Sequence, residues 1–512
     1  MEEEARREDH HLDSFLAWAA ELGVTDSPCN SMSQQNSNRC LGNSLVVSHF
    51  PDAGGRGLGA ARDLRKGELV LRVPKAALFT TIRLLGDDPK LSSAVNGHPS
   101  LSPTQRLGVC LLHEMGKGRD SWWWPYLKQL PRGYDTLATF SEFEKQALQV
   151  DDAVWTAEKA ILKAKMEWRQ AKLVMEQLQF KPKFRSFGAW TWVCATISSR
   201  TMHVSWDEAG TLCPVGDFFN YAAPGEESSG LDGGCHTSES FLEDGLLANG
   251  IASDQLTTKG LNSHLDSFVD AGFEDHLAAY CFYARRDYKK GEQVLLAYGT
   301  YTNLDLLEHY GFLLAKNLNE KAFIPLEPGI LSLTSWPQDS IYLHADGKPS
   351  FALLSALRFY VSSPQQRRSI LHLVYSGSQL SEDNEINASR LLSKKCHEVL
   401  QSLPTTTEED DLLLSVIERI QDMNCPVEVG KLLCSFRGEI SAFLDGHKDL
   451  PAAHDKIVEF LLSSRAKSSL GKWKLAVQWR RGYKQIIADC ICFCTEVIEG
   501  FSHQNEVNIP EP

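Results

Sequence analysis

Long apolar runs are missing from this 512-residue chain, and so is any surplus of positive charge. No stretch approaches the roughly 20 apolar residues of a membrane-spanning helix. The 52 lysine and arginine residues are outnumbered by 66 aspartate and glutamate residues, which gives a formal net charge of −14. Nucleic acids and anionic membranes attract positive surfaces, so we expect neither as a direct partner. A negative surface suits a basic peptide, but it serves solubility equally well.

Targeting signals and metal-binding cysteine patterns are also missing. The amino-terminal stretch MEEEARREDHHLDSF has no apolar run and is too acidic for a transit peptide, so we expect a cytoplasmic or nuclear protein, or both. Thirteen cysteines without framework spacing suit free thiols in a reducing compartment. The densest group, Cys490, Cys492 and Cys494, is spaced too tightly for a zinc knot and predicts a thiol-rich helix or strand. We therefore predict no metal site.

Motifs of several enzyme classes are missing as well. Without a Walker loop, a nucleophile elbow or an HExxH motif, phosphoryl transfer, serine hydrolysis and zinc proteolysis have no support. Residues 55–60, GRGLGA, match the GxGxxA form of the dinucleotide fingerprint, but turn and strand residues follow where that site needs a helix. We reject a dinucleotide site. Two alternatives stay open: a structural hairpin, or a hairpin whose glycines let the backbone approach a ligand.

Hydrophobic periodicity divides what is present into a β-rich part and a helical part. Residues 13–24 predict a short helix, and residues 44–74 predict short strands broken by glycine-containing turns. Residues 100–205 and almost everything after about residue 320 have helical patterns. The stretch at 225–275 is rich in glycine, serine and aspartate, which predicts a surface insertion. A chain of this length also predicts at least two packed units.

Three segments, in this order, resemble parts of a SET domain. GGRGLGAARDLRKGELVLRVP resembles its opening, and PVGDFFNYAAP resembles its Asp-x-x-Asn-His segment. YARRDYKKGEQVLLAYGTYTNLDLLEHYGF resembles its closing segment, down to Tyr-Gly, Asn and Tyr-Gly-Phe. With the helical tail, the combination is similar to the Rubisco large-subunit methyltransferase-like branch of SET proteins, found among plant SET domain group proteins. The resemblance covers residues 13–500, with 28–40 and 225–275 unmatched.

This resemblance implies an α+β fold. An amino-terminal helix and polar loop (1–43) would precede a β-rich SET domain at 44–315. That domain would be split by a helical insert at about 86–205 and by the polar insertion at about 225–275. An all-helical domain at 320–505 would follow and dock a protein substrate. The branch does without flanking zinc knots, and we expect a monomer.

The resemblance also implies methyl transfer from S-adenosylmethionine to a protein side chain, usually lysine, and we expect a non-histone substrate. A lysine amine, with a pKa of about 10.4, is mostly protonated at neutral pH and attacks only after it loses a proton. A narrow, partly dry channel favours the neutral amine and aligns it with the methyl group. A tyrosine hydroxyl at the channel mouth orients both without competing as a nucleophile.

Position by position, the resemblance assigns catalytic roles to Tyr298, the central tyrosine, and Tyr310, a second tyrosine lining the lysine channel. The residues assigned to the cofactor are Arg56, Gly57, Leu58, Arg200, Asp217, Asn220, Tyr221 and Tyr298. Arg56 to Leu58 would run beside the cofactor as main chain, and Arg200 would lie near its carboxylate and the substrate entrance. The main chain and amide of the segment from Asp217 to Tyr221 would hold the adenosine.

Tyr221 departs from the family, which has histidine at this position. If the position contributes mainly backbone atoms, tyrosine is tolerated; if the ring is needed, cofactor affinity falls. Three functions therefore stay open: a lysine methyltransferase, a histidine methyltransferase of the same fold, and a non-catalytic SET-derived scaffold that binds a partner through its helical domain. The paired tyrosines favour lysine.

Overall fold

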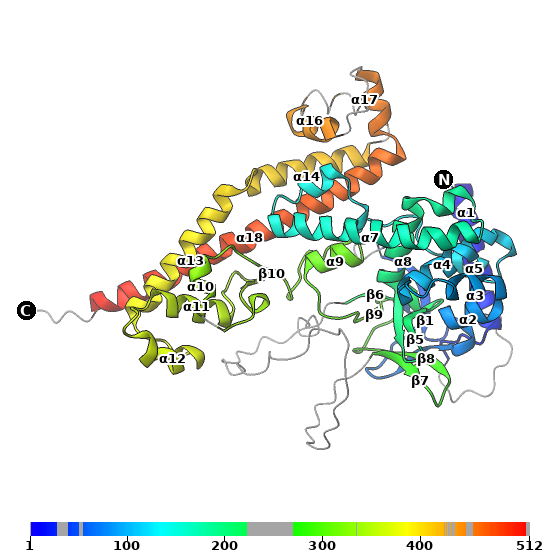
Figure 1. Ribbon diagram of the computed structural model, residues 1–512, viewed down its shortest axis with the longest axis horizontal. Coiled ribbons are helices and arrows are strands. Elements are labelled where there is room, and N and C mark those ends of the chain that lie inside the picture. The colour runs from blue at the N-terminus through cyan, green and yellow to red at the C-terminus, as the bar shows by residue number, and fades with distance from the viewer. Residues whose placement is uncertain are drawn as a thin grey trace, which may run out of the picture.

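A computed structural model describes residues 2–27, 39–50, 55–222, 270–333, 335–423, 437–446 and 454–507, with four single positions between 424 and 436. Most of the predicted insertion at 225–275, and of the unmatched stretch at 28–40, lies outside the described residues. The protein is elongated, with the strands at one end and long helices reaching to the other (Figure 1). Its buried apolar side chains form two large clusters, one in the strand-containing body and one among the carboxy-terminal helices.

Short paired strands, rather than one large sheet, make up the β-rich core. The antiparallel pairs are β1 (Leu45–Phe50) with β2 (Gly55–Ala60), β3 (Leu69–Pro74) and β7 (Ala271–Glu274) on either side of β8 (Ala279–Tyr283), and β4 (Thr201–Val204) with β5 (Asp207–Leu212). β6 (Asn220–Tyr221) runs parallel to β9 (Leu295–Leu296). The strands predicted at 44–74 are therefore present, and GRGLGA forms β2, not a nucleotide-binding turn.

The chain that follows the Lys-Lys-Gly turn is the part of the core that bears on function. Residues 280–299, YCFYARRDYKKGEQVLLAYG, predict two strands across this turn. The second strand shortens to β9, which joins β6 and does not pair with β8. The reason lies just before β9, where the Val294 N–H donates to the Leu58 carbonyl and the Ala60 N–H donates to the Glu292 carbonyl. These bonds draw the closing segment across β2, so segments far apart in sequence meet at β2, β6 and β9.

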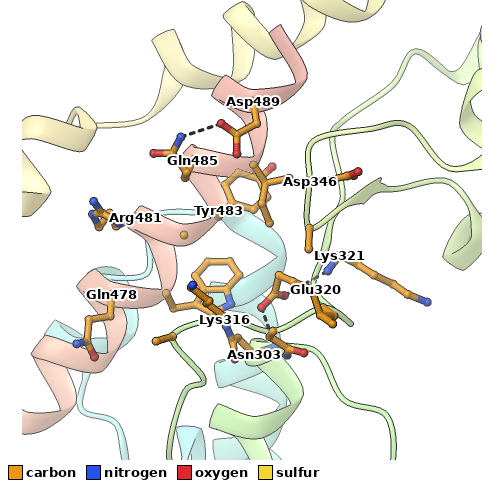
Figure 2. Close-up of a pocket in the computed structure, with 17 residues that line it drawn as sticks. Asn303, Lys316, Glu320, Lys321, Asp346, Gln478, Arg481, Tyr483, Gln485 and Asp489 are labelled. Atoms are coloured by element: carbon orange, nitrogen blue, oxygen red, sulfur yellow. Dashed lines mark hydrogen bonds between the residues drawn. The ribbon is translucent and has the colours of Figure 1, made fainter. Parts of the chain in front are cut away.

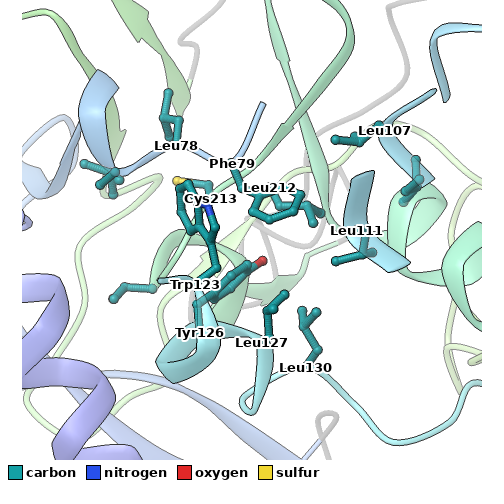
Figure 3. Close-up of a cluster of buried hydrophobic side chains, with 14 of the residues drawn as sticks. Leu78, Phe79, Leu107, Leu111, Trp123, Tyr126, Leu127, Leu130, Leu212 and Cys213 are labelled. Carbon is teal, nitrogen blue, oxygen red and sulfur yellow. The ribbon is translucent and has the colours of Figure 1, made fainter. Parts of the chain in front are cut away.

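Helices cover this core on one side (Figure 1). They are α1 (Glu2–Glu21), α2 (Thr81–Asp87), α3 (Pro89–Asn96), α4 (Pro103–Lys117), α5 (Trp124–Leu127), α7 (Asp151–Gln177) and α8 (Phe187–Arg200), whereas α6 (Glu142–Gln146) packs against the carboxy-terminal helices. α1 starts well before the predicted residue 13 because its glutamate-, alanine- and arginine-rich first turns favour helix without apolar periodicity. Side chains of α4, α5 and their connecting segments meet β5 in the first cluster (Figure 3).

The carboxy-terminal part is nearly all helical, as the sequence predicts. Its elements are α9 (Asn303–His309), β10 (Lys321–Ala322), α10 (Pro328–Leu331), β11 (Leu343–His344), α11 (Phe351–Val361), α12 (Arg367–Tyr375), α13 (Glu382–Ser402), α14 (Thr407–Asp422), α16 (Arg437–Gly446), α17 (His454–Leu461) and α18 (Ser464–Val507). α13 and α14 lie along α18 (Figure 1). Together with the β-rich body, this arrangement confirms the predicted α+β class.

The cysteine-rich run falls within α18, as a helix. Cys490 and Cys494 are buried, Cys492 is exposed, and all three are unbonded thiols. A spacing of four residues places Cys490 and Cys494 on the same face of the helix, which explains their burial. Within the described ranges, no group of three or more His, Cys, Asp or Glu side chains is arranged to hold a metal ion. None of the described helices is both long and apolar enough to cross a membrane.

The helical insert and the carboxy-terminal helices share a core. Leu137, Leu148 and Ala157, from the region of the predicted insert, are fully buried in the second cluster, together with residues of α13, α14 and α18. A buried polar network adds to this joint. Asp410 of α14 accepts hydrogen bonds from Arg480 at 2.6 Å and Lys484 at 2.6 Å, and Arg480 also donates to the Ala147 carbonyl at 2.7 Å.

Candidate active site

Aromatic rings from β6, the end of β9 and the α9 region gather into one cluster, which we call the tyrosine cluster: Tyr221, Tyr298, Tyr301, Tyr310 and Phe312. The parallel pairing of β6 with β9 places Tyr221 opposite Leu296, two residues before Tyr298. The ring centroids of Tyr298 and Tyr310 are 5.4 Å apart and nearly parallel, and Tyr221 lies 5.3 Å from Tyr298. The structure thus brings both predicted catalytic tyrosines together.

The two catalytic candidates are neutral hydroxyl donors. Tyr298 donates its hydroxyl hydrogen to the Phe219 carbonyl, directly before β6. Burial raises the pKa of Tyr298 well above its ordinary value. Burial, with the neighbouring Tyr301 hydroxyl, does the same to the pKa of Tyr310. Neither phenol therefore ionises near neutral pH, so each offers a neutral hydroxyl and a ring face, and not a phenolate base or nucleophile.

Tyr221 joins the β6 segment to the chain after β9 by a second hydrogen bond, which runs in the opposite direction to that of Tyr298. Its hydroxyl donates to the Gly299 carbonyl at 2.8 Å, while Tyr298 donates to Phe219. Gly299 has φ = +144°, and a Cβ there would lie 3.0 Å from the Tyr301 ring, so the position requires glycine. The residue that departs from the family is thus built into the cluster through its ring and its hydroxyl.

Tyr221→Phe should lower kcat about three- to tenfold and leave KM for the methyl donor nearly unchanged. The variant keeps the ring and loses one neutral hydrogen bond, worth about 0.5–1.5 kcal/mol. That bond holds the backbone beside Tyr298 and does not bind the donor. Steady-state kinetics of methyl transfer would measure the effect. An unchanged kcat, or a rise in KM alone, would contradict this positioning role.

Arg200, Asp217 and Tyr126 form a buried polar group below the cluster. Arg200 ends α8 and donates to the Asp217 carboxylate at 3.1 Å and to the Asp217 carbonyl at 2.9 Å. Tyr126 donates to the same carboxylate oxygen at 3.0 Å. Burial opposes the charge of Arg200, but Asp217 outweighs it and raises the pKa of the guanidinium. The charge of Arg200 is therefore neutralised within the protein, which suits a positioning role.

One oxygen of the Asp217 carboxylate is an unused hydrogen-bond acceptor among the described residues. This oxygen, Oδ1, is buried and accepts no hydrogen bond from the part of the chain that the structure describes. A buried carboxylate oxygen favours a donor. The 3₁₀ turn that carries Asp217 follows Val215, whose φ of +69° is strained for a β-branched residue. The buried surroundings of Val215 and Asp217 maintain this strained turn, which places the carboxylate beside Arg200.

The stretch from Arg56 to Leu58 presents its main chain to the site. The Arg56 guanidinium turns away, donating to the Gln129 side chain at 2.8 Å and lying 4.2 Å over the Phe218 ring. Leu58 is fully buried in the core. The Asn220 side-chain amide instead faces this backbone, with its nitrogen 3.4 Å from the Arg56 carbonyl. The main-chain role of these residues beside the cofactor stays a prediction, and the Leu58 carbonyl already accepts from the Val294 N–H.

The surroundings of Gly57 show whether the residues of the site fit an adenosine-bearing cofactor. A Cβ at this position would lie 2.7 Å from both the Asn220 and Gln293 amide nitrogens, so any side chain would displace them. Because Gly57 has no side chain, the Asn220 and Gln293 side-chain amides and the Arg56 carbonyl lie along one edge of β2. Amides both donate and accept hydrogen bonds, as a nucleoside requires. The residues present fit such a group, and Asn220 is the side chain placed to contact it.

A relative with high identity decides the family. The Arabidopsis thaliana protein SET DOMAIN GROUP 40 is 52% identical over 493 residues, covering 96% of each chain. The chain belongs to the SET-domain protein methyltransferases of the Rubisco large-subunit methyltransferase-like branch. A family model described as Rubisco LSMT substrate-binding matches residues 305–487.

Solved structures agree with this family in fold. The SET domain of LSMT bound to lysine and AdoHcy is 16% identical with a TM-score of 0.54, and the match covers 97% of this chain and 92% of that one. Rubisco LSMT bound to AdoMet matches with a TM-score of 0.51 and covers 98% and 97%. More distant relatives are named as methyltransferases that act on histidine. The actin-histidine N-methyltransferase of Xenopus tropicalis is 24% identical and covers 80% of this chain and 66% of its own.

Family resemblance located the two tyrosines and Asn220, but it missed the residues that hold Asp217 and Arg56. These are Tyr126 and Gln129, which follow three adjacent tryptophans in a run that predicts only an aromatic core. Tyr301 and Phe312 stand in the closing segment and were visible as neighbours of Tyr298 and Tyr310. Their membership in the cluster follows from α9, which returns the chain to the strands.

A separate cavity of about 390 Å³ lies where the α9–β10 connection meets α18 (Figure 2). Its lining includes Lys316, Glu320 and Lys321 from the connection and Arg481 and Asp489 from α18. No predicted site residue lines it within the described chain. Burial raises the pKa of Glu320 to about 7, although the Asn303 and Lys321 backbone N–H groups donate to its carboxylate.

Glu320→Gln should raise the free energy of unfolding at pH 8 by about 1–3 kcal/mol. A carboxyl whose pKa rises from 4.5 to about 7 on folding stabilises the protein fully below pH 4.5 and loses that contribution as the pH approaches 7. Glutamine removes the titration and keeps an acceptor oxygen. Urea unfolding from pH 5.5 to 8 would show the gain shrinking toward low pH. The exposed Glu418→Gln is the control, and a pH-independent difference would contradict the assignment.

Proposed function

We propose that this protein transfers a methyl group from S-adenosylmethionine to a lysine side chain of a non-histone protein. The observation that carries the proposal is the stacked pair of neutral tyrosines beside the cradle of Gly57 and Asn220. When bound, the cofactor supplies an electrophilic methyl group. The aromatic faces of Tyr298 and Tyr310 suit a cationic or amine-bearing nucleophile, and their neutral hydroxyls orient it without reacting.

The chain's own residues divide the work. Asn220 and the main chain at Gly57 would hold the adenosine. Arg200 and Asp217 would fix the 3₁₀ turn that precedes Asn220 in the chain. Tyr298 would hold the Phe219 carbonyl and order the reacting groups. The low polarity around the tyrosine cluster favours a neutral lysine amine, because burial penalises its charged form. The helices matched by the substrate-binding family would dock the protein substrate.

A histidine side chain is the second candidate substrate. It is supported by relatives with 22–25% identity over 80% of the chain, which are actin-histidine methyltransferases. Tyr221 bears on this choice because it fills, with a hydroxyl-bearing ring, the position that holds histidine in the family. A non-catalytic scaffold is the third alternative. We expect the protein in the cytoplasm, the nucleus or both.

Incubation of the purified protein with methyl-labelled cofactor and a plant cell extract would test the proposal. Mass spectrometry of the labelled protein would identify the methylated residue. Label on lysine supports the proposal, and label on histidine replaces it with the second candidate. If calorimetry detected no binding of S-adenosylmethionine to the full chain, both catalytic functions would be rejected in favour of the scaffold.

A further inference from the structure

The long helix α7 exposes a row of large apolar side chains. Trp155, Leu162, Met166 and Leu173 expose 61%, 58%, 59% and 58% of their surface. Their spacing of seven, four and seven residues aligns them on one face over about 27 Å of helix. A contiguous apolar row on an otherwise polar surface marks an interaction site more often than single exposed residues do.

The opposite face of α7 fixes this orientation. Ala153, Ala157, Ala164 and Ala171 are buried, each exposing at most 3% of its surface. Ala153 and Ala157 belong to the second hydrophobic cluster and Ala171 to the first, so this face packs α7 against both. The helix therefore has no freedom to rotate its exposed row inward. α7 lies across the middle of the molecule in Figure 1, and it contacts α9.

Cations border the apolar row on both sides. Lys159 and Lys163 flank it on one side and Lys165 and Arg169 on the other, and all four are exposed. Lys159 also lies 5.0 Å from the Trp155 ring centroid. From Trp155 to Leu173 there are five lysine and arginine residues against two glutamates, a local charge of +3 in a chain of net charge −14.

The middle of this face, from Lys159 to Arg169, is positive, whereas Asp151 and Asp152 are exposed at the amino-terminal end of α7, before Trp155. Glu158 forms an ion pair with Lys145 at 2.6 Å, and Glu167 is partly buried beside Cys194. Lys172, the fifth cation of the count, pairs with Glu176 of the next turn at 3.7 Å. The four flanking cations therefore define the potential of the apolar row, which we call the α7 stripe: Trp155, Lys159, Leu162, Lys163, Lys165, Met166, Arg169 and Leu173.

We propose that the α7 stripe docks an acidic amphipathic helix of another protein. Apolar positions at seven- and four-residue steps accept a facing helix in the manner of a coiled-coil seam, and flanking charges select the partner by complementarity. A second copy of this chain paired through α7 would bring like charges together. An anionic membrane would be repelled by the remaining acidic surface of the chain. The surface is separate from methyl transfer and does not rest on the proposed function.

A synthetic helical peptide would test this docking surface on the full-length protein. The probe carries leucine at seam positions and glutamate beside them over about three heptads. Fluorescence anisotropy at low and high salt would measure its Kd. We expect at least tenfold weaker binding for the double variant Leu162→Glu, Met166→Glu and for Lys159→Glu, Lys163→Glu. Leu412→Glu, at an exposed apolar residue of α14, should bind like the unaltered chain.

The controls separate the other occupants. Because the altered side chains are exposed, the variant proteins should have the same thermal unfolding midpoint as the unaltered chain. A peptide with lysine in place of glutamate should not bind. The proposal is overturned if the unaltered protein does not bind the acidic peptide or if all variants bind it with the same Kd. The same holds if the lysine peptide binds as tightly as the acidic one. It is also overturned if the stripe variants abolish only vesicle binding (phosphatidylserine-containing vesicles) or only dimerisation in sedimentation experiments.

Discussion

Tyr298→Phe should lower kcat for methyl transfer by at least about a hundredfold, because it removes a preorganised donor at the reacting centre. The hydroxyl holds the Phe219 carbonyl at the start of the segment that carries Asn220 and Tyr221. Its high pKa keeps it a neutral donor throughout the pH range of an assay. Phenylalanine preserves the stacking on Tyr310, so the loss isolates the hydroxyl. A hundredfold loss corresponds to about 2.7 kcal/mol of transition-state stabilisation.

Radiolabel transfer under saturating cofactor and substrate would measure the change. Tyr283→Phe is the matched control, since it removes a tyrosine hydroxyl that donates to Glu274 outside the tyrosine cluster. The control should keep nearly full activity. Binding of S-adenosylmethionine to Tyr298→Phe, followed by calorimetry, should persist. Activity within a few fold of the unaltered enzyme would remove Tyr298 from the catalytic role.

Asp410→Asn should lower the free energy of unfolding by about 3–5 kcal/mol. Asp410 is fully buried and accepts from both Arg480 and Lys484, which expose 3% and 1% of their surface. Asparagine has the same shape but no charge, so two buried cations would face no counter-charge. Arg480 also donates to the Ala147 carbonyl, and the damage should therefore spread from α18 to the helical insert.

The neighbouring residue offers the control for this prediction. Asp411 pairs with Arg481 on the surface, where the two side chains expose 51% and 40%. Exposed pairs contribute roughly 0–1 kcal/mol, so Asp411→Asn should change stability little. Urea unfolding followed by circular dichroism would compare the two variants. Equal effects of Asp410→Asn and Asp411→Asn would show that the buried network does not stabilise the protein.

Local patterns predicted the parts of the fold that depend on local chemistry. Glycine-broken β runs predict the hairpin of β1 with β2. Pro404 and the threonines after it, with the acidic residues Glu408–Asp411, predict a helix start, and α14 begins there with a capping box of Thr406 and Glu409. The tyrosines and Asn220 came from resemblance in the order of motifs. Each of these signals lies within a short segment, where residue type and spacing act directly on the backbone.

Contacts between distant segments were beyond such patterns. Tyr126 donates to a carboxylate 91 positions away, and Arg480 to a carbonyl 333 positions away. Neither pair leaves a periodic or spacing signal, because the partners meet only after whole elements pack. The same reason explains β9, whose length was overestimated: its neighbours β6 and β2, and not its own sequence, decide where pairing ends.

The shared core of the insert and the carboxy-terminal helices sets the boundaries of any working chimera. A graft that exchanged only residues 320–505 with a relative would leave Leu137, Leu148 and Ala157 facing a foreign surface. The graft should therefore carry the stretch from Leu137 to Ala157 along with the tail. Recombination within this family would be expected to keep those two segments as one inherited unit, although about 160 residues of the SET core separate them in the chain.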